Sequence, residues 1–278
     1  MKKVTILIAV LIIPLLTFSQ ITAPKEVSGG PMKKFEYTPK VKNQVEITNL
    51  LGKISLKNAS GNTIIIESDF DMERPERAEG LKLLGAMEDN TNLGINVTEE
   101  NGIVTISGIT KQVKNCKYII SIPQGVAVNL DYSSPFASSD VEVDSYKGSL
   151  EIKTLNAKVK LTECTGPFTV NSISGDVEAI FSNVSQDEPS SLASVSGFVD
   201  VSIPADSKAS FELRSTTGNI YNNLNLTPVK EEKVDKRAAD FVDFDTLKRS
   251  GGNNYTLNGG GQKILLKSIS GNIYLRKK

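Results

Sequence analysis

The chain has 278 residues, of which 39% are hydrophobic and 23% are charged, and its 32 basic and 32 acidic side chains give a formal net charge of zero. This balance argues against nucleic acid as the main partner and leaves no polybasic patch for anionic lipid. The sequence contains no His, which excludes imidazole general bases, Ser–His and Cys–His nucleophile pairs and His metal ligands.

The N-terminus has the pattern of a secretory signal peptide at residues 1–19. Lys2 and Lys3 form a basic start, and an almost unbroken apolar run follows from Val4 to Leu16. This run is shorter than the about 20 residues of a spanning helix, and Pro14 interrupts it, so we expect cleavage rather than an uncleaved anchor. The mature protein would then be exported, slightly acidic, and without a stable membrane span.

From residue 41 onward one short phrase recurs, in which a Gly, usually after Ser or Thr, is followed by apolar residues two and four positions later. Such alternation predicts half-buried strands. The Gly is expected to supply the positive φ of a tight turn between them. Several copies stand nine residues apart, as at Gly148, Gly166 and Gly175 with Ala157 in a Gly place. The clearest copies are Ser174–Ala179, Ser196–Val201 and Ser270–Leu275.

Stacked units of this kind bury a continuous core that a single unit cannot form. We therefore predict an all-β protein, a single-domain parallel β-solenoid similar to a right-handed β-helix, over residues 41–278. Residues 20–40 are expected to be a linker or a first edge strand. In most copies the Gly stands at the same distance in sequence from the inward-facing residues, as a repeat related by translation requires. The alternative is an antiparallel β-sandwich, because nine-residue spacing also suits hairpins.

Two segments break the pattern and are predicted to be insertions, at about residues 69–92 and 227–261. In the first, Glu88-Asp89-Asn90 suits a capped turn or, alternatively, oxygen ligation of Ca²⁺. The second contains Gly259-Gly260-Gly261, which lacks the Lys-Ser/Thr of a phosphate-binding loop. Because the repeat accounts for the fold, we expect features that are specific to this protein to lie in these two insertions.

Few side chains suggest a chemical site. The two cysteines, Cys116 and Cys164, could pair in an exported protein or could remain separate, partly buried thiols. Acidic residues that a glycan-cleaving site would need are spread along the chain, and tyrosines could either stack on carbohydrate or pack within strands. We assign no catalytic, cofactor-binding or metal-binding residue. The candidates considered were Asp131, Asp140, Asp144, Asp176 and Asp200, and Tyr132, Tyr146, Tyr221, Tyr255 and Tyr274.

The Ser-Gly copies, the strands that end in Ile-Pro at Pro123 and Pro204, and the closing pattern of Gly259–Ile273 resemble the bacterial "putative adhesin" family with β-strand repeats, a domain of unknown function. The stretch Ala78–Leu81 is similar to Bacteroidetes-type exported members. The resemblance covers about Val45–Leu275. It implies an exported right-handed β-solenoid without known catalytic residues, in the periplasm or at the surface of a Gram-negative bacterium or outside the cell.

Together these observations predict a non-catalytic exported cell-envelope protein, an adhesin or binding scaffold that is not an enzyme. Its partner would be an envelope or extracellular macromolecule, protein or glycan, and neither nucleic acid nor a cofactor is expected. One alternative is a polysaccharide-active enzyme on the same solenoid, which would need a groove with converging acidic and basic side chains. The other is a structural protein linked to envelope stress.

Overall fold

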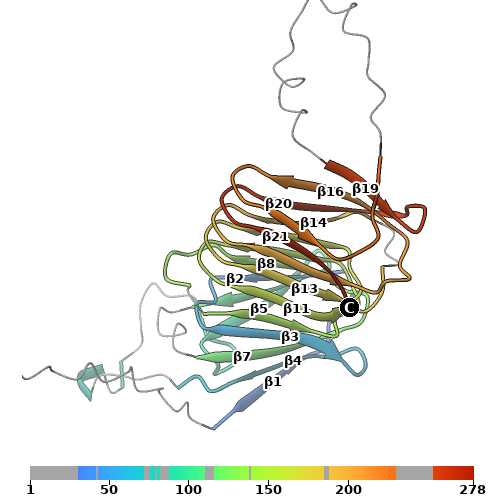
Figure 1. Ribbon diagram of the computed structural model, residues 1–278. Helices are drawn as coiled ribbons and strands as arrows, with labels where there is room; N and C mark the ends of the chain where they lie inside the picture. Colours follow the sequence, from blue (N-terminus) through green and yellow to red (C-terminus); the bar gives the residue numbers. More distant parts are fainter. Residues whose placement is uncertain are drawn as a thin grey trace, which may run out of the picture.

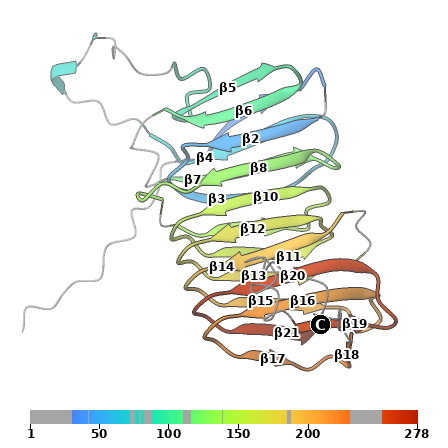
Figure 2. The ribbon, with the colours of Figure 1, turned by 90° about the horizontal axis from the view of Figure 1, so that it is seen from above.

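The computed structural model describes residues 31–41, 43–71, 76–78, 80–81, 88–109, 116–137, 139–184, 188–229 and 253–278. The predicted signal peptide at residues 1–19 lies outside them. Within these ranges the protein is built from two large β-sheets and one 3₁₀ turn, η1 (Glu76–Ala78). The strands stack side by side along one elongated body (Figures 1 and 2).

One sheet has ten strands and the other has eleven. From β8 to β17 the chain alternates between them, so each coil of the solenoid contributes one strand to each sheet. The ten-stranded sheet has the order β1 (Lys33–Tyr37), β4 (Ile64–Ser68), β7 (Lys117–Pro123), β3 (Lys53–Ala59), β9 (Val141–Asp144), β11 (Val159–Cys164), β13 (Val177–Phe181), β15 (Val199–Ile203), β21 (Ile273–Lys277), β17 (Ile220–Asn222). The eleven-stranded sheet has the order β18 (Thr227–Pro228), β19 (Asn253–Leu257), β16 (Ala209–Ser215), β20 (Gln262–Ser268), β14 (Ser190–Ser194), β12 (Phe168–Ser172), β10 (Leu150–Thr154), β8 (Ala127–Tyr132), β2 (Gln44–Thr48), β6 (Ile103–Gly108), β5 (Ile95–Glu100).

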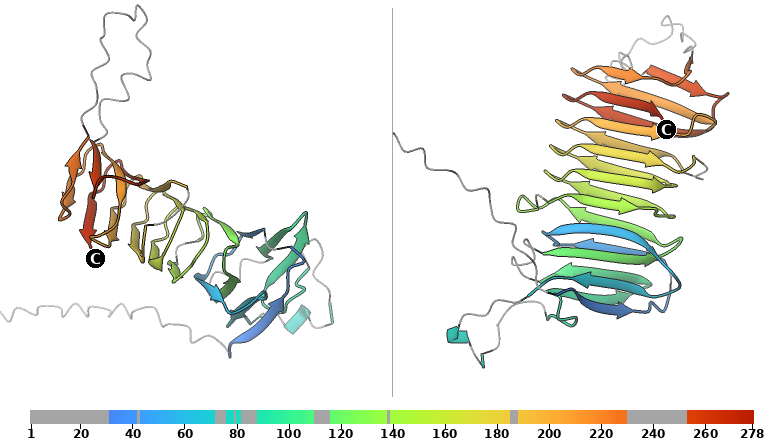
Figure 3. Two further views of the ribbon diagram at one scale, coloured as in Figure 1. Left: turned by 90° about the vertical axis from the view of Figure 1, so that its right-hand side faces the viewer. Right: turned by 60° about the horizontal axis from the view of Figure 1, so that its bottom comes forward.

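The all-β solenoid predicted from the repeat is confirmed. Pairing is parallel through the middle of both sheets, and the antiparallel pairs of the described strands, β1–β4, β4–β7, β5–β6, β16–β19 and β18–β19, are all toward the two ends. The protein is therefore not an antiparallel sandwich. Figure 3 shows the coils following one another with the two sheets facing each other.

The core lies between the sheets and follows the predicted alternation. In β13, Val177 and Ala179 are buried whereas Glu178 between them is partly exposed. The parallel register stacks equivalent residues into rows, such as Ile47, Leu130, Ile152, Val170, Leu192 and Leu266 across the eleven-stranded sheet. Each fully buried aliphatic side chain contributes about 1.5–3 kcal/mol relative to exposure, so these rows hold the coils together.

Spatial order differs from chain order at both ends of the solenoid. The coil β2–β3 lies between coils β8–β9 and β6–β7. The coil β20–β21 lies between coils β14–β15 and β16–β17. The phrases at Ser196 and Ser270 are consequently stacked neighbours, and the Ser270 N–H donates to the carbonyl of Val195 at 2.8 Å. A simple translational repeat would have placed each coil next to its sequence neighbour.

The predicted reason for the repeated glycines holds at only some copies. Positive φ occurs at Gly61, Gly102 and Gly166 but not at Gly175, Gly197, Gly218 or Gly271. At these four positions a Cβ atom would lie 1.9–2.4 Å from the carbonyl oxygen of the equivalent residue in the next coil. The glycines are required because the turns of adjacent coils approach too closely for any side chain.

The segments assigned to insertions and to the N-terminal linker are only partly described. Strand β1 forms one edge of the ten-stranded sheet, and β17 forms the other. Within 69–92, Phe70 is buried in the core, whereas residues 72–75, 79 and 82–87 lie outside the described ranges. Within 227–261, β18 and β19 belong to the eleven-stranded sheet, whereas residues 230–252 lie outside those ranges.

Candidate functional site

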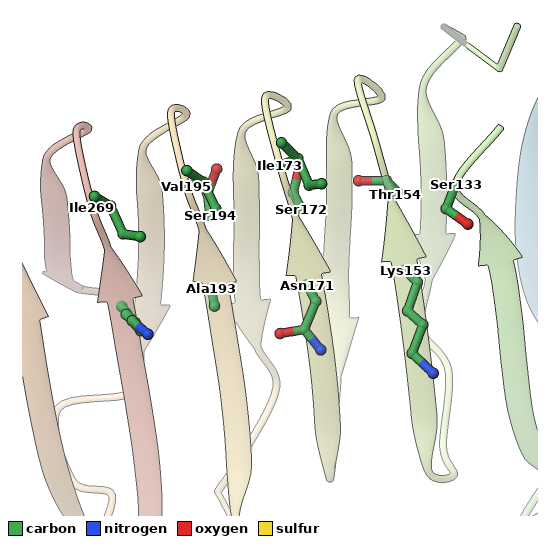
Figure 4. Close-up of a pocket in the computed structure, with 11 residues that line it drawn as sticks. Ser133, Lys153, Thr154, Asn171, Ser172, Ile173, Ala193, Ser194, Val195 and Ile269 are labelled. Carbon is green, nitrogen blue, oxygen red and sulfur yellow. The ribbon is translucent and has the colours of Figure 1, made fainter. Parts of the chain in front are cut away.

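An open groove crosses the eleven-stranded sheet beside the turns that follow β8, β10, β12, β14 and β20 (Figure 4). We call it the turn groove; its volume is about 360 Å³. Its floor is formed by Lys153, Asn171, Ala193 and Lys267, and its wall by Ile173, Val195 and Ile269.

The floor is a single row of outward-facing residues. Parallel register places Lys153 beside Asn171, Asn171 beside Ala193 and Ala193 beside Lys267. These residues face outward because the residue before each of them on its strand is inward and buried. Ala193 has the smallest side chain of the row, so the floor is lowest at the centre of the groove.

The wall is an exposed apolar row in the turns themselves. Ile173, Val195 and Ile269 are 49%, 39% and 37% exposed. They align because Val195 N–H donates to the Ser172 carbonyl at 3.1 Å and Ile269 N–H to the Ser194 carbonyl at 3.3 Å. Successive coils are about 4.8 Å apart, so the three aliphatic side chains form a continuous edge. Contiguous exposed apolar surface is typical of interaction sites.

Buried hydroxyl groups support the wall from beneath. Ser194 Oγ donates to the Gly175 carbonyl and accepts from Gly197 N–H, both at 2.9 Å. Ser268 Oγ likewise donates to the Gly197 carbonyl at 3.1 Å and accepts from Gly271 N–H at 2.9 Å. Each hydroxyl therefore connects two adjacent coils at the base of the groove.

Ser172 occupies the same position in its coil but differs from Ser194 and Ser268. Its Oγ is buried and has no hydrogen-bond partner among the described residues. An unsatisfied buried hydroxyl costs about 1–3 kcal/mol. Ser172 also lines the turn groove, directly below the wall residue that follows it, Ile173.

Positive charge stands at the two ends of the floor and no acidic side chain lines the groove. The ammonium of Lys153 is 2.7 Å from Glu151 on the same strand, and this hydrogen bond raises the pKa of Lys153. Three strand intervals separate Lys153 from Lys267, or about 14 Å. The groove is therefore long, apolar on one side and neutral in the middle, with a lysine at each end, of which Lys153 is already paired with Glu151.

The outer face of the ten-stranded sheet has a different character. Several of its charges form ion pairs between coils, with Nζ–O distances of 2.8 Å for Lys53–Glu142, 2.7 Å for Lys158–Glu178 and 2.5 Å for Lys278–Glu163. The Lys53 hydrogen bond lowers the pKa of Glu142. Exposed ion pairs of this kind contribute little stability, but they neutralise the face they cover.

The five aspartates considered in the sequence do not converge. Asp131 caps the end of β8 through Ser133 N–H, at 3.1 Å. Asp144 accepts from the adjacent Ser145 hydroxyl. The other two with side-chain partners are Asp176, which accepts from Phe198 N–H at 3.0 Å, and Asp200, which is held by Arg276. Asp140 contributes its backbone carbonyl to Ile54 N–H.

Metal-type clusters are likewise not seen within the described ranges, where no three His, Cys, Asp or Glu side chains gather. Asp89 forms the capped turn: its carboxylate accepts from the N–H groups of Thr91, Asn92 and Gly94 at 2.8–3.0 Å. These bonds give Asp89 the role of a backbone cap in this turn.

The five tyrosines divide between core and surface. Tyr132 and Tyr146 are buried, and their hydroxyls donate to backbone carbonyls. Burial raises the pKa of Tyr132 to about 12. Tyr255 is half-buried, whereas Tyr221 and Tyr274 stack on each other on the outer face of the ten-stranded sheet.

Neither cysteine forms a disulfide. Cys116 precedes β7 and Cys164 ends β11, and two strands lie between these in the sheet. The separation of about 14 Å greatly exceeds the Cα–Cα limit of about 7 Å for a disulfide. Burial raises the pKa of each thiol to about 11.

Sequence reasoning missed the turn groove, although a signal was present. The repeat is defined by its Gly and the apolar residues after it, whereas the wall residues lie two positions before the Gly. Ser172-Ile173-Ser174-Gly175, Ser194-Val195-Ser196-Gly197 and Ser268-Ile269-Ser270-Gly271 share one aliphatic residue between two serines. An aliphatic residue repeated inside a polar turn indicates a surface row.

In the described part of the chain, no helix has the length and apolar character needed to cross a membrane.

Comparison with known proteins gave one family and several solved structures. A protein-family model described as Toastrack DUF4097 matches residues 39–257. No curated protein matches the sequence. A structure described as a "putative cell adhesion protein" from Clostridium sporogenes is 10% identical with a TM-score of 0.44, over 89% of this chain and 99% of that one.

Two further structures come from Bacteroidetes. A "putative adhesin" from Bacteroides fragilis is 13% identical with a TM-score of 0.31, over 89% of this chain and 97% of that one. A "putative lipid binding protein" from Parabacteroides distasonis is 12% identical with a TM-score of 0.28, over 90% and 98%. All three TM-scores are below 0.5, so we draw nothing further from these likenesses.

Proposed function

The chain belongs to the Toastrack DUF4097 family, and from that premise we propose that it is a non-catalytic exported scaffold of the cell envelope that binds a macromolecular partner along the turn groove. The observation that carries the proposal is the turn groove itself, which has a continuous exposed apolar wall above a floor that is neutral at its centre. The ion pairs between coils lie outside its lining, on the ten-stranded sheet and at Lys263–Glu212 on the eleven-stranded sheet.

The shape and charge of the groove favour an elongated partner with negative charge. The floor runs across four strands, from Lys153 to Lys267, and Lys267 has no ion pair with any described residue. A chain-like molecule could place apolar groups against the wall and anionic groups at the two lysines. An acidic glycan or an extended acidic protein segment has this chemistry.

Several features support a role without catalysis. The chain lacks His, and the lining of the turn groove has two basic side chains but no acidic one. General acid–base chemistry on a glycan needs two carboxyl groups facing one another across the bond. The groove instead provides surface and charge, which suits binding.

Export is part of the proposal and rests on the signal-peptide pattern of residues 1–19. A place in the periplasm, at the surface or outside a Gram-negative cell agrees with this pattern. Adhesion is the specific role proposed for the groove. A fusion of residues 1–40 to a reporter enzyme that stays in the cytoplasm would refute export.

The binding proposal is tested with purified protein and isolated Gram-negative envelopes. Ala193→Glu would fill the lowest part of the floor with a negative charge, and we expect at least about tenfold weaker binding, equivalent to about 1.4 kcal/mol. Ser202→Glu places the same charge on β15 in the other sheet, beside Arg276 in the register, and should bind as the unmodified protein does.

Measuring the same binding at several salt concentrations gives a second test. Binding that depends on Lys153 and Lys267 should weaken as ionic strength rises, because exposed charges are screened over about 8–10 Å near physiological salt. Equal binding of the Ala193→Glu and unmodified proteins would refute the groove as the site. Failure of the unmodified protein to bind any envelope fraction, together with unchanged adhesion on gene deletion, would refute the scaffold role.

A further inference from the structure

A row of aromatic rings lies on the outer face of the ten-stranded sheet, on the opposite side of the solenoid from the turn groove. We call Phe198, Tyr274 and Tyr221 the aromatic strip. The Phe198 and Tyr274 ring centroids are 6.0 Å apart in an edge-to-face arrangement, and the Tyr274 and Tyr221 rings are stacked at 5.4 Å with planes 11° apart. The strip runs from Phe198, the residue before β15, across β21 to β17 at the end of this sheet.

The strip ends in an open ring face. Strand β17 is the edge of the sheet, and it pairs only with β21 among the described strands. One face of the Tyr221 ring lies against Tyr274, so the other face points away from the sheet, beyond its edge. Tyr221 is 50% exposed. An exposed aromatic face that continues a row of rings offers a surface on which an apolar ligand face can stack.

The Tyr274 ring, on which Tyr221 stacks, is held in place by other side chains. Arg276 lies with its guanidinium carbon 5.2 Å from the Tyr274 ring centroid. Its Nε is 2.8 Å and 3.0 Å from the two carboxylate oxygens of Asp200. The Tyr274 hydroxyl accepts from the Asn272 side chain at 3.0 Å. Tyr221 therefore stacks on a ring whose position is already fixed, which lowers the entropy cost of binding on its free face.

Amide residues flank Tyr221 in the sequence: Asn219, Asn222, Asn223 and Asn225 are all exposed. Asn219 and Asn223 alternate in phase with Tyr221, whereas Asn222 pairs in register with the inward Leu275. The Oδ1 atom of Asn222 accepts from Leu224 N–H and that of Asn223 from Lys277 N–H, both at 2.6 Å. These bonds orient the two amides and leave their NH₂ groups as donors. No charged residue occurs between Ser215 and Val229.

We propose that Tyr221 and its neighbouring asparagines form a binding site for a neutral sugar ring, a pyranose unit of an uncharged glycan. The C–H face of a pyranose stacks on an aromatic face, while amides both donate to and accept from its hydroxyls. The segment itself supplies no charge, and the nearby guanidinium of Arg276 is already paired with the carboxylate of Asp200. A single-stranded nucleic acid would need basic residues along its backbone as well as a stacking ring.

A strand from another chain is the other conceivable occupant of this edge. Strand β17 has three residues, which is short for stable pairing, because strands commonly pair over five or six residues. The neutral sugar is therefore the occupant to which we commit.

The test uses the full mature chain and a panel of neutral hexasaccharides built from glucose, galactose, mannose or xylose. Isothermal titration or ligand-observed NMR would measure binding. We expect at least one member to bind. Tyr221→Ala should weaken that binding by at least about fivefold, whereas Tyr221→Phe, which keeps the ring, should stay within about twofold.

Two controls separate this site from others. Phe136→Ala removes an exposed aromatic ring elsewhere on the protein and should not change sugar binding. Ala193→Glu in the turn groove should not change it either, so the two sites can fail independently. Circular dichroism would confirm that the Tyr221 variants fold.

Two results would overturn the proposal. One is the absence of binding by every member of the panel at 10 mM, a concentration about tenfold above a millimolar dissociation constant. The other is equal binding by Tyr221→Ala and the unmodified protein. Dimerisation in solution that Tyr221→Ala abolishes, without any sugar binding, would identify the edge as a contact between copies and would likewise refute the sugar site.

Discussion

Replacing Gly197 by Ala tests the idea that the repeated glycines are required by contact between coils. The added Cβ would lie 2.4 Å from the Gly175 carbonyl oxygen, 2.7 Å from its carbon and 2.9 Å from Asp176 N, all backbone atoms. Real Cβ contacts are almost never shorter than 3.0 Å, so the coils must separate locally by at least about 0.6 Å.

That separation would stretch the adjacent hydrogen bonds between coils. Ser196 N–H to the Ile173 carbonyl is 2.9 Å and Val177 N–H to the Phe198 carbonyl is 3.0 Å. Overpacking costs about 1–3 kcal/mol, and one weakened hydrogen bond about 1 kcal/mol. We therefore expect Gly197→Ala to lower the free energy of unfolding by about 2–4 kcal/mol.

Urea denaturation followed by circular dichroism would measure this loss, with Ser196→Ala as the matched control. Ser196 is exposed in the same turn, and its replacement should change stability by no more than about 0.5 kcal/mol. If Gly197→Ala were as stable as the control, the contact between coils would not be the reason for the glycine, and the explanation offered for all four positions would fail.

Further predictions follow from the turns and from the buried ionisable groups. Ser194→Ala should cost about 1–3 kcal/mol because it leaves the Gly175 carbonyl and Gly197 N–H unpaired. Ser172→Ala should cost clearly less because the Ser172 hydroxyl has no partner in the described structure; parallel urea titrations would measure both, and equal losses would contradict the assignment. Thiol labelling at pH 8 should be slow for Cys116 and Cys164 until the protein unfolds, because the pKa of each is raised to about 11, and rapid labelling of Cys164 in the folded state would be the contrary result. The raised pKa values of these thiols and of Tyr132 also predict a pH dependence in base, because the unfolded chain loses these protons at a lower pH than the folded protein does. Their contribution to the free energy of unfolding should be fully present below about pH 9 and should be lost as the pH rises toward 11–12. The lowered pKa values of Glu142 and Glu212 predict the opposite dependence in acid, with stability lost as pH falls below about 4.5; melting temperatures from pH 3 to 11 would show both limits.

Alternation predicted most of the strands because the physical cause is local. Val177 and Ala179 are inward and Glu178 is outward for reasons contained in five residues. Chain order, by contrast, does not state which coils touch. Nothing within Ser270–Leu275 indicates that this copy stacks on Ser196–Val201 rather than on the coil that precedes it in the chain, because every copy offers a similar inward surface.

For the tyrosines, the position in the inward–outward alternation of a strand predicts burial better than the residue type does. Tyr132 follows Val128 and Leu130 at intervals of two, which places it on the inward side of β8. Tyr274 lies between Ile273 and Leu275, the inward residues of β21, and therefore faces outward. The sequence could thus have separated core tyrosines from surface ones. It could not show that Tyr221 would stack on Tyr274, because that contact depends on β21 lying beside β17.

The interleaved order of the coils has a consequence for biosynthesis. Coil β16–β17 is translated before coil β20–β21, yet the later coil separates it from β14–β15. A nascent chain that docked β16 directly onto β14 would close the place that β20 must occupy. The place between coils β14–β15 and β16–β17 therefore has to stay open until β21 has been made. A premature stop codon shortly before residue 262 would remove this internal coil and leave coil β16–β17 without its neighbour.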